Sequence, residues 1–281
     1  MNKPCIIIHC GAGKWEGAHC DAKQYRQKLK RIVKRSFAVL AKDGARDACL
    51  YAVAAMENDP LFNAGTGSKI QRDGQIRMSA AIMSSADKRF SGVANIRNVK
   101  NPIQIADMLH AERHTVLAGE EATDFARQKN VRFYNPATSH RLQEYRDKLV
   151  GETGTVGAVA LDSQGSITAA TSTGGIGYEL PGRIGDSATV AGTYATGVCG
   201  VSCTGRGEDI VNQAAASSLV TRVEDGMPLA AAISRLVTES NAYGYRLGLI
   251  ALTQTGEVTI GETENMNVMY AAYDGTALDC F

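Results

Sequence analysis

The pattern of apolar and polar residues in the second half of the chain centres on one short run. Residues 156–161 carry no polar side-chain atom, which is typical of a strand that is buried on both faces. The polar turn 162–165 and the residues 166–173 predict that a second strand pairs with the first as a hairpin. Thr155 stands at the head of the first strand, directly after Gly154, where a glycine can adopt the backbone angles of a strained bend.

The rest of the chain shows blocks of strands and blocks of helices. Residues 10–13 predict a turn after the first strand, and glycines and prolines separate most later elements. Because the strands cluster around Thr155, we expect an α+β fold of two packed sheets with helices outside. The predicted strands are 5–9, 76–84, 90–98, 154–161, 166–173, 190–195, 198–204, 247–253, 258–261 and 268–273, and the predicted helices are 22–42, 45–56, 102–111, 115–129, 208–223 and 229–241.

The segment 131–154 differs in character from its neighbours. Residues 134–140 contain structure-breaking polar residues and a proline, and the charged residues 141–148 suit a short helix or a tether. We expect an exposed linker here, where a chain can be cut with little loss of core. The chain as a whole, 1–281, is predicted to form a single domain.

Composition and charge exclude several classes of function. The 281 residues are 44% hydrophobic, and 30 basic against 29 acidic residues give a formal net charge of +1, which provides no electrostatic case for nucleic acid. The 7 cysteines are odd in number and include no C-x-x-C pair, which predicts reduced thiols in a cytoplasmic protein. The first apolar run is too short for a signal peptide, and no run approaches the ~20 apolar residues of a membrane span.

Two short motifs imitate functional sites without the residues that such sites need. The glycines after residue 10 resemble a dinucleotide-binding turn, but the third glycine and the helix come too late. His110 and His114 have a spacing that can hold a metal. Since no further ligand is evident, we expect a partly exposed pair of histidines instead.

The junction of Gly154 and Thr155 suggests a specific chemistry. A hydroxyl that follows a strained peptide bond can attack the preceding carbonyl, and hydrolysis would then leave Thr155 as a new N-terminus. Its amine would titrate near pH ~8. An N-terminal threonine carries both nucleophile and base, which is one way to activate a hydroxyl. The alternative is a buried strand that merely begins with threonine.

Polar residues set among glycines at strand ends are further candidates. The sets 171–175 and 202–208 would expose backbone N–H groups, which can build an oxyanion hole. Between them, Arg183 and Asp186 flank a glycine-rich turn. An arginine can bind a carboxylate through two hydrogen bonds and an aspartate can hold an ammonium, so the pair could grip an amino acid. The alternative is a surface ion pair.

Together these motifs resemble the isoaspartyl peptidase/L-asparaginase family, the plant-type asparaginases among the N-terminal-nucleophile hydrolases. The resemblance covers nearly the whole chain. It implies a four-layer αββα sandwich, autocleavage before Thr155 into 1–154 and 155–281, and a homodimer of the resulting heterodimers. It also implies β-aspartyl dipeptidase and L-asparaginase activity on small substrates. The motifs that carry the resemblance are 9–13, 59–65, 99–102, 154–162, 171–175, 182–187, 192–195 and 201–208.

The resemblance also implies roles for individual residues. Thr155 would be the nucleophile, and Thr173 would hydrogen-bond to it. Arg183 and Asp186 would bind the substrate's α-carboxylate and α-amine. The remaining implied site residues are Thr204 and Gly205 for the oxyanion, Gly207 in the lining and Asn63 near the nucleophile. No cofactor is required, but members often hold sodium on backbone carbonyls, which here would be those of Met56, Glu57, Asp59, Phe62, Ala64 and Thr66.

The sequence departs from the family at several places. Cys10 replaces the first glycine of His-Gly-Gly-Ala-Gly, and Ser79 begins a segment that usually starts with aspartate. The alternatives are an uncleaved, inactive relative that acts as a binding protein, a taspase-like threonine protease, or a glycosylasparaginase. Asp186 argues against the taspase, and the missing signal peptide argues against glycosylasparaginase.

Overall fold

Two β-sheets form the centre of the molecule. The structure is a computed structural model that describes residues 3–13, 21–149, 154–264 and 266–281. In these ranges the larger sheet has eight strands, in the order β12 (Leu278–Cys280), β11 (Asn267–Tyr273), β1 (Cys5–Gly13), β5 (Val156–Leu161), β6 (Ile167–Thr173), β2 (Met78–Ser84), β3 (Arg89–Ile96) and β4 (Val116–Ala118). The smaller has the order β10 (Val258–Glu262), β9 (Leu247–Thr253), β8 (Cys199–Gly205) and β7 (Thr193–Ala195).

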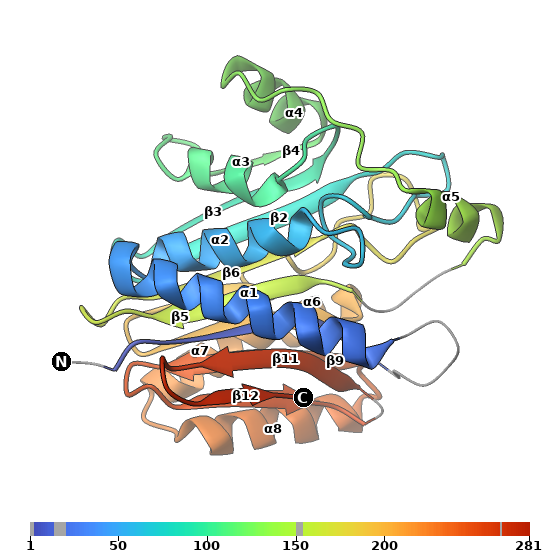
Figure 1. Ribbon diagram of the computed structural model, residues 1–281. Helices are drawn as coiled ribbons and strands as arrows, with labels where there is room; N and C mark the ends of the chain where they lie inside the picture. Colours follow the sequence, from blue (N-terminus) through green and yellow to red (C-terminus); the bar gives the residue numbers. More distant parts are fainter. Residues whose placement is uncertain (1–2, 14–20, 150–153, 265) are drawn as a thin grey trace.

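Helices cover the outer faces of these sheets. Figure 1 shows α1 and α2 over the larger sheet, with α7 and α8 against the smaller sheet. The described helices are α1 (Ala22–Asp43), α2 (Ala45–Glu57), α3 (Pro102–Leu109), α4 (Gly119–Gln128), α5 (Ser139–Arg146), α6 (Gly207–Gln213), α7 (Ala215–Glu224) and α8 (Leu229–Ala242).

The core explains why β5 and the first half of β1 are continuous apolar runs. In β1, Ile6 and Ile8 pack with α1 and α2, whereas Ile7 packs with Val159 and Leu252 between the two sheets. Strand β5 is likewise buried throughout. A strand with helices on one face and a second sheet on the other has no solvated face, which favours continuous apolar runs over alternation.

The predicted hairpin is confirmed, since β5 and β6 pair antiparallel with Val156 opposite Ser172. Strand β1 lies on the other side of β5, with His9 opposite Gly157. The first 154 residues therefore contribute a strand directly beside the one that begins after Thr155.

Several predicted boundaries were wrong. Residues 10–13 continue β1 through a register irregularity instead of forming a turn. The predicted helix 115–129 begins as the short strand β4. The predicted helix 208–223 is two helices, because Ala214 adopts the left-handed region with φ 48°. Strand β12 was not predicted.

The expected linker is partly structured. It contains α5, whose Arg141 is buried and donates from Nε to the carbonyl of Gly67 at 2.6 Å. Residues 150–153 of this segment lie outside the described ranges. The linker is thus docked on the body of the molecule at α5.

Most of the histidines and cysteines noted in the sequence lie within the described ranges. The expectation of a partly exposed pair of histidines was wrong for His110, which is buried and bonds Asp87 at 2.6 Å. No cluster of three or more metal-binding side chains occurs in these ranges. Cys5, Cys49, Cys199, Cys203 and Cys280 are free thiols, and Cys20 lies outside the described residues. A search of the described helices finds none with the length and apolarity to span a bilayer.

Candidate active site

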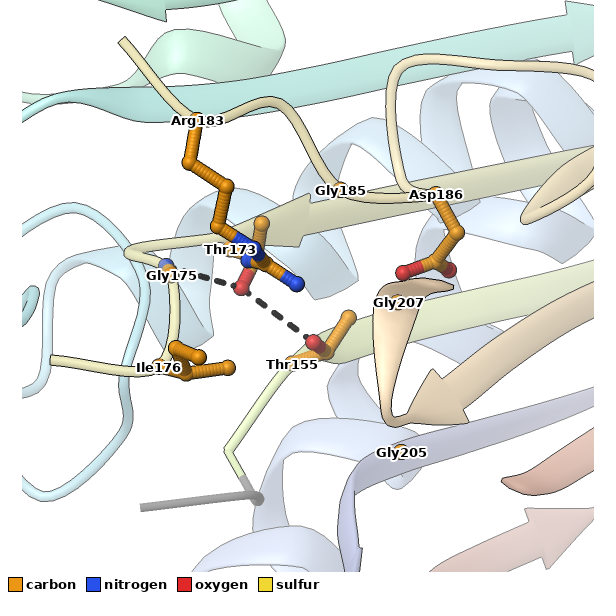
Figure 2. A pocket seen from close by; sticks show the side chains of 9 residues that line it. All are labelled: Thr155, Thr173, Gly175, Ile176, Arg183, Gly185, Asp186, Gly205 and Gly207. Atoms are coloured by element: carbon orange, nitrogen blue, oxygen red, sulfur yellow. Dashed lines mark hydrogen bonds between the residues drawn. The ribbon is translucent and has the colours of Figure 1, made fainter. Parts of the chain in front are cut away.

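A pocket opens at the head of β5, where strands of both sheets end. Thr155 Oγ1 donates to Thr173 Oγ1 at 3.2 Å, and Thr173 Oγ1 accepts from the N–H of Gly175 at 3.2 Å. Both threonines are only 8% exposed. Figure 2 shows their hydroxyls facing the same space. The pocket lining consists of Thr155, Thr173, Gly175, Ile176, Arg183, Gly185, Asp186, Gly205 and Gly207.

The peptide before Thr155 has the expected glycine-dependent bend. Gly154 has φ 127°, a region that residues with a side chain rarely adopt. An added Cβ would lie 2.6 Å from Cβ of Asn63. Asn63 is itself fixed, because its Nδ2 donates to the carbonyl of Gly175 at 2.6 Å and its Oδ1 accepts from the N–H of Lys69 at 3.0 Å. Asn63 thus supports the junction without lining the pocket.

Arg183 enters the pocket already held by two carboxylates. Its Nε and Nη2 donate to the two oxygens of Glu208 at 2.7 and 2.8 Å, and its Nη1 donates to Glu179 at 3.4 Å. Sequence reasoning missed both partners. The hydrogen bonds from Arg183 hold the pKa of Glu208 below its usual range, so Glu208 is ionised at neutral pH. A surface ion pair of Arg183 with Asp186 is not what forms.

Asp186 is buried in a different way. It is 4% exposed, and burial raises its pKa to about 7. Its Oδ2 has no hydrogen-bond partner within the described part of the chain. A Cβ added to Gly192 would lie 2.4 Å from Oδ2, and one added to Gly207 would lie 3.1 Å from Oδ1, so glycines make room for this carboxyl. Figure 2 shows Arg183 and Asp186 approaching the space before Thr155 from different sides.

The end of β8 supplies the other predicted residues. Thr204 is fully buried and does not line the pocket, but its Oγ1 lacks a partner among the described residues. Gly205 does line the pocket with φ 132°, and an added Cβ would lie 2.6 Å from the carbonyl oxygen of Arg246. This turn can therefore be built only with glycine.

A chain of buried polar groups runs from β1, the strand beside β5, to the loop that carries Asp186. His9 Nε2 bonds Ser202 Oγ at 2.9 Å, and Ser202 Oγ bonds Thr171 Oγ1 at 2.7 Å. Thr193 lies 2.6 Å from Thr171 and 3.0 Å from the carbonyl of Ser187. Burial lowers the pKa of His9 to about 3, so the ring stays neutral. This contact also explains the glycine in β5, because a Cβ on Gly157 would lie 2.0 Å from Ser202 Oγ.

Ser79 takes part in holding the same loop. Its Oγ accepts from the N–H of Asn95 at 3.3 Å, and Asn95 Nδ2 donates to the carbonyl of Gly182 at 2.8 Å. Ser79, which departs from the family pattern, thus helps to hold Gly182, the residue before Arg183, through Asn95. Cys10, the other departure, is buried within β1.

Backbone carbonyls crowd the glycines of the loop that is expected to hold sodium. The N–H of Thr66 donates to the carbonyl of Glu57 at 2.7 Å. A Cβ on Gly65 would lie 2.5 Å from the Glu57 oxygen and 2.7 Å from that of Lys100, and one on Gly67 would lie 2.6 and 2.9 Å from the oxygens of Pro60 and Phe62. Hard cations prefer oxygen ligands, so the chemistry of this loop fits such an ion.

Comparison with known proteins agrees with the geometry. A family model described as Asparaginase matches residues 2–152 and 145–279. The isoaspartyl peptidase/L-asparaginase of Synechocystis sp. is 43% identical over 98% of this chain and 89% of its own length. The isoaspartyl peptidase of Salmonella typhimurium is 36% identical over 97% of this chain and 96% of its own, and the plant-type L-asparaginase of Pyrococcus horikoshii is 35% identical over 95% of each. The chain belongs to this asparaginase family.

Proposed function

We propose that this chain is an isoaspartyl dipeptidase and L-asparaginase whose nucleophile is Thr155. The observation that carries the proposal is the position of the Thr155 hydroxyl, in a pocket that also contains the side chains of Arg183 and Asp186. The printed names of its relatives, isoaspartyl peptidase and L-asparaginase, agree with it. The order of helices, sheet, sheet and helices supports the four-layer αββα sandwich of the N-terminal-nucleophile hydrolases.

The nucleophile is made by autocleavage. Thr155 Oγ1 attacks the carbonyl carbon of Gly154, the C–N bond breaks, and the threonine nitrogen becomes a free amine as an ester forms. Water hydrolyses the ester and leaves a carboxylate on Gly154. The pieces 1–154 and 155–281 remain together because β1 and β5 are hydrogen-bonded neighbours in one sheet.

The mature site would act on a β-amide. With its α-carboxylate on Arg183 and its α-amine on Asp186, an amino acid presents its side-chain carbonyl to Thr155. The amine of Thr155 removes the hydroxyl proton. The backbone of Gly205, which lines the pocket, stabilises the oxyanion, and we assign the adjacent Thr204 to the same role because its Oγ1 has no partner among the described residues. Collapse releases ammonia or an amino acid and leaves a β-aspartyl ester, which water hydrolyses to aspartate. Glutamine is one methylene longer, and a misplacement of about 1 Å can cost ~10²-fold.

Other properties extend the proposal. A sodium ion would be held by backbone carbonyls of the loop from Met56 to Thr66, and its charge would stiffen the loop that carries Asn63. No other cofactor is needed. We further propose a cytoplasmic homodimer of heterodimers. The two competing functions are an uncleaved binding protein and a taspase-like protease. The buried oxygen of Asp186, which has no partner among the described residues, favours a site for an amino acid over the taspase.

The proposal is tested on the purified protein by a denaturing gel, N-terminal sequencing and hydrolysis assays. We expect two bands, a new N-terminus at Thr155, and turnover of β-aspartyl-leucine at least equal to that of asparagine. Glutamine and α-aspartyl-leucine should be turned over negligibly. Thr155→Ala should fold and remain one chain, whereas Thr155→Ser keeps a hydroxyl and should still cleave.

Two results would refute the proposal. A single chain without a new N-terminus after long incubation would rule out autocleavage and favour the binding protein. A preference for glutamine or the α-linked dipeptide would rule out the assigned orientation of the substrate.

A further inference from the structure

The guanidinium of Arg183 is fixed by groups that do not line the pocket. Glu208 accepts from Nε and Nη2, and Glu179 accepts from Nη1. Glu208 is half exposed on the first turn of α6, with 50% of its side chain accessible against 14% for Arg183. The pair therefore reaches from the molecular surface to the pocket.

The terminal nitrogens of Arg183, Nη1 and Nη2, lie beside two glycines of the pocket lining. A guanidinium has five N–H donors, and the two carboxylates engage one on each nitrogen. This leaves one N–H on Nη1 and one on Nη2. A Cβ on Gly185 would lie 3.3 Å from Nη1, and one on Gly207 would lie 2.8 Å from Nη2. Both glycines line the pocket, so the outer edge of the guanidinium meets it where side chains are absent.

We infer that Glu208 is a positioning residue for substrate recognition: it holds Arg183 by one edge so that the outer edge faces the α-carboxylate of the substrate. A carboxylate can then accept both free N–H groups in the fork-to-fork arrangement. Glu208 does not have to leave for the substrate to bind. The inference rests on the proposed function and adds a residue that acts through Arg183.

The rival interpretation is that Glu208 competes with the substrate for Arg183. It would require the substrate to use the same edge, Nε and Nη2, that Glu208 now occupies. The two interpretations predict opposite changes in KM when Glu208 loses its charge. If Glu208 positions Arg183, its loss raises KM, and if it competes, its loss lowers KM.

The experiment compares wild type with Glu208→Gln and Glu208→Ala. We expect KM for asparagine and β-aspartyl-leucine to rise roughly two- to five-fold, as for a partly exposed ion pair, with kcat and autocleavage almost unchanged. Glutamine keeps one acceptor oxygen, so its effect should be smaller than that of alanine. The matched control is Glu239→Gln, which removes a partly exposed carboxylate that pairs with Arg222 and Arg235 and should leave KM unchanged.

Inhibition by two small acids shows whether the effect acts through Arg183. L-Aspartate carries the α-carboxylate and β-alanine lacks it. Glu208→Gln should weaken inhibition by aspartate and leave that by β-alanine unaltered. The inference would be overturned by a lower or unchanged KM in Glu208→Gln, or by inhibition that weakens equally for aspartate and β-alanine. In each of these cases turnover by the wild type would still uphold the proposed function. A wild type without turnover would refute both.

Discussion

Two buried carboxyl groups near the active site share a raised pKa but differ in their partners. Burial raises the pKa of both Glu57 and Asp186 to about 7. Glu57 Oε1 accepts from Ser172 Oγ at 2.7 Å and from the N–H of Ile103 at 3.0 Å, while Oε2 accepts from Asn101 Nδ2 at 3.0 Å. Asp186, in contrast, has an oxygen without a partner in the described ranges.

We interpret this difference as one between a carboxyl that supports the fold and one that is proposed to bind the substrate. Glu57 ties the end of α2 to Ser172 in β6 and to the start of α3, and therefore supports the strand that ends at Thr173. A buried oxygen without a partner costs free energy. The cost at Asp186 is offset if the missing partner is the ammonium of a substrate.

The largest expected consequence is in catalysis. Asp186→Asn should lower kcat/KM for asparagine by about one to two decades, because losing a charge-assisted contact costs ~1.5–3 kcal/mol. Glu57→Gln, the matched change of carboxyl to amide, should leave kcat/KM within a few-fold of wild type. Steady-state kinetics on the two variants decides this. Equal losses would remove the functional distinction between the carboxyls.

The second consequence is in stability, where Glu57→Gln should have the larger effect and Asp186→Asn the smaller. Glu57→Gln places an amide N–H₂ against a donor and should cost ~1–3 kcal/mol. At about 2–4 °C per kcal/mol, thermal unfolding should show a fall of several degrees. Asp186→Asn should show no such fall at neutral pH. A Tm for Glu57→Gln equal to that of wild type would mean that its hydrogen bonds do not stabilise the fold.

The helices and strands around the two carboxyls could be predicted from the sequence where burial alone determines the pattern of apolar residues. Strand β5 is apolar throughout because it lies between helices and a second sheet, and its hairpin with β6 follows. The break at Ala214 could not be predicted, because alanine carries no signal for a left-handed backbone. Residues 10–13 gave a turn signal through their glycines, yet they continue β1 by pairing with β11.

Residues of the candidate site could be predicted only where they are neighbours in sequence or where the family resemblance assigns them a role. The resemblance brought Thr155, Thr173, Arg183 and Asp186 together, and the structure places these four in one pocket. The pairing of Arg183 with Glu208 spans 25 positions and depends on how the intervening loop folds. Glu208 belonged to a motif noted in the sequence, but nothing in that motif indicated its partner.

The smallest expected effect is a change of stability with pH, which follows from the raised pKa of Asp186. An aspartate has a pKa near ~3.9 in an unfolded chain and about 7 here, so the folded state binds the proton more tightly. The stability from this protonation is fully present below pH ~4 and is lost as the pH rises through about 7. Asp186→Asn has no proton to lose.

The Tm of Asp186→Asn relative to wild type should therefore rise by a few degrees between pH 5 and pH 8, in thermal scans without ligand. Saturating aspartate supplies an ammonium to the ionised carboxylate and should reduce that rise by stabilising wild type alone. A Tm difference that stays constant across this range would show that Asp186 is ionised throughout and already has a partner in the free protein.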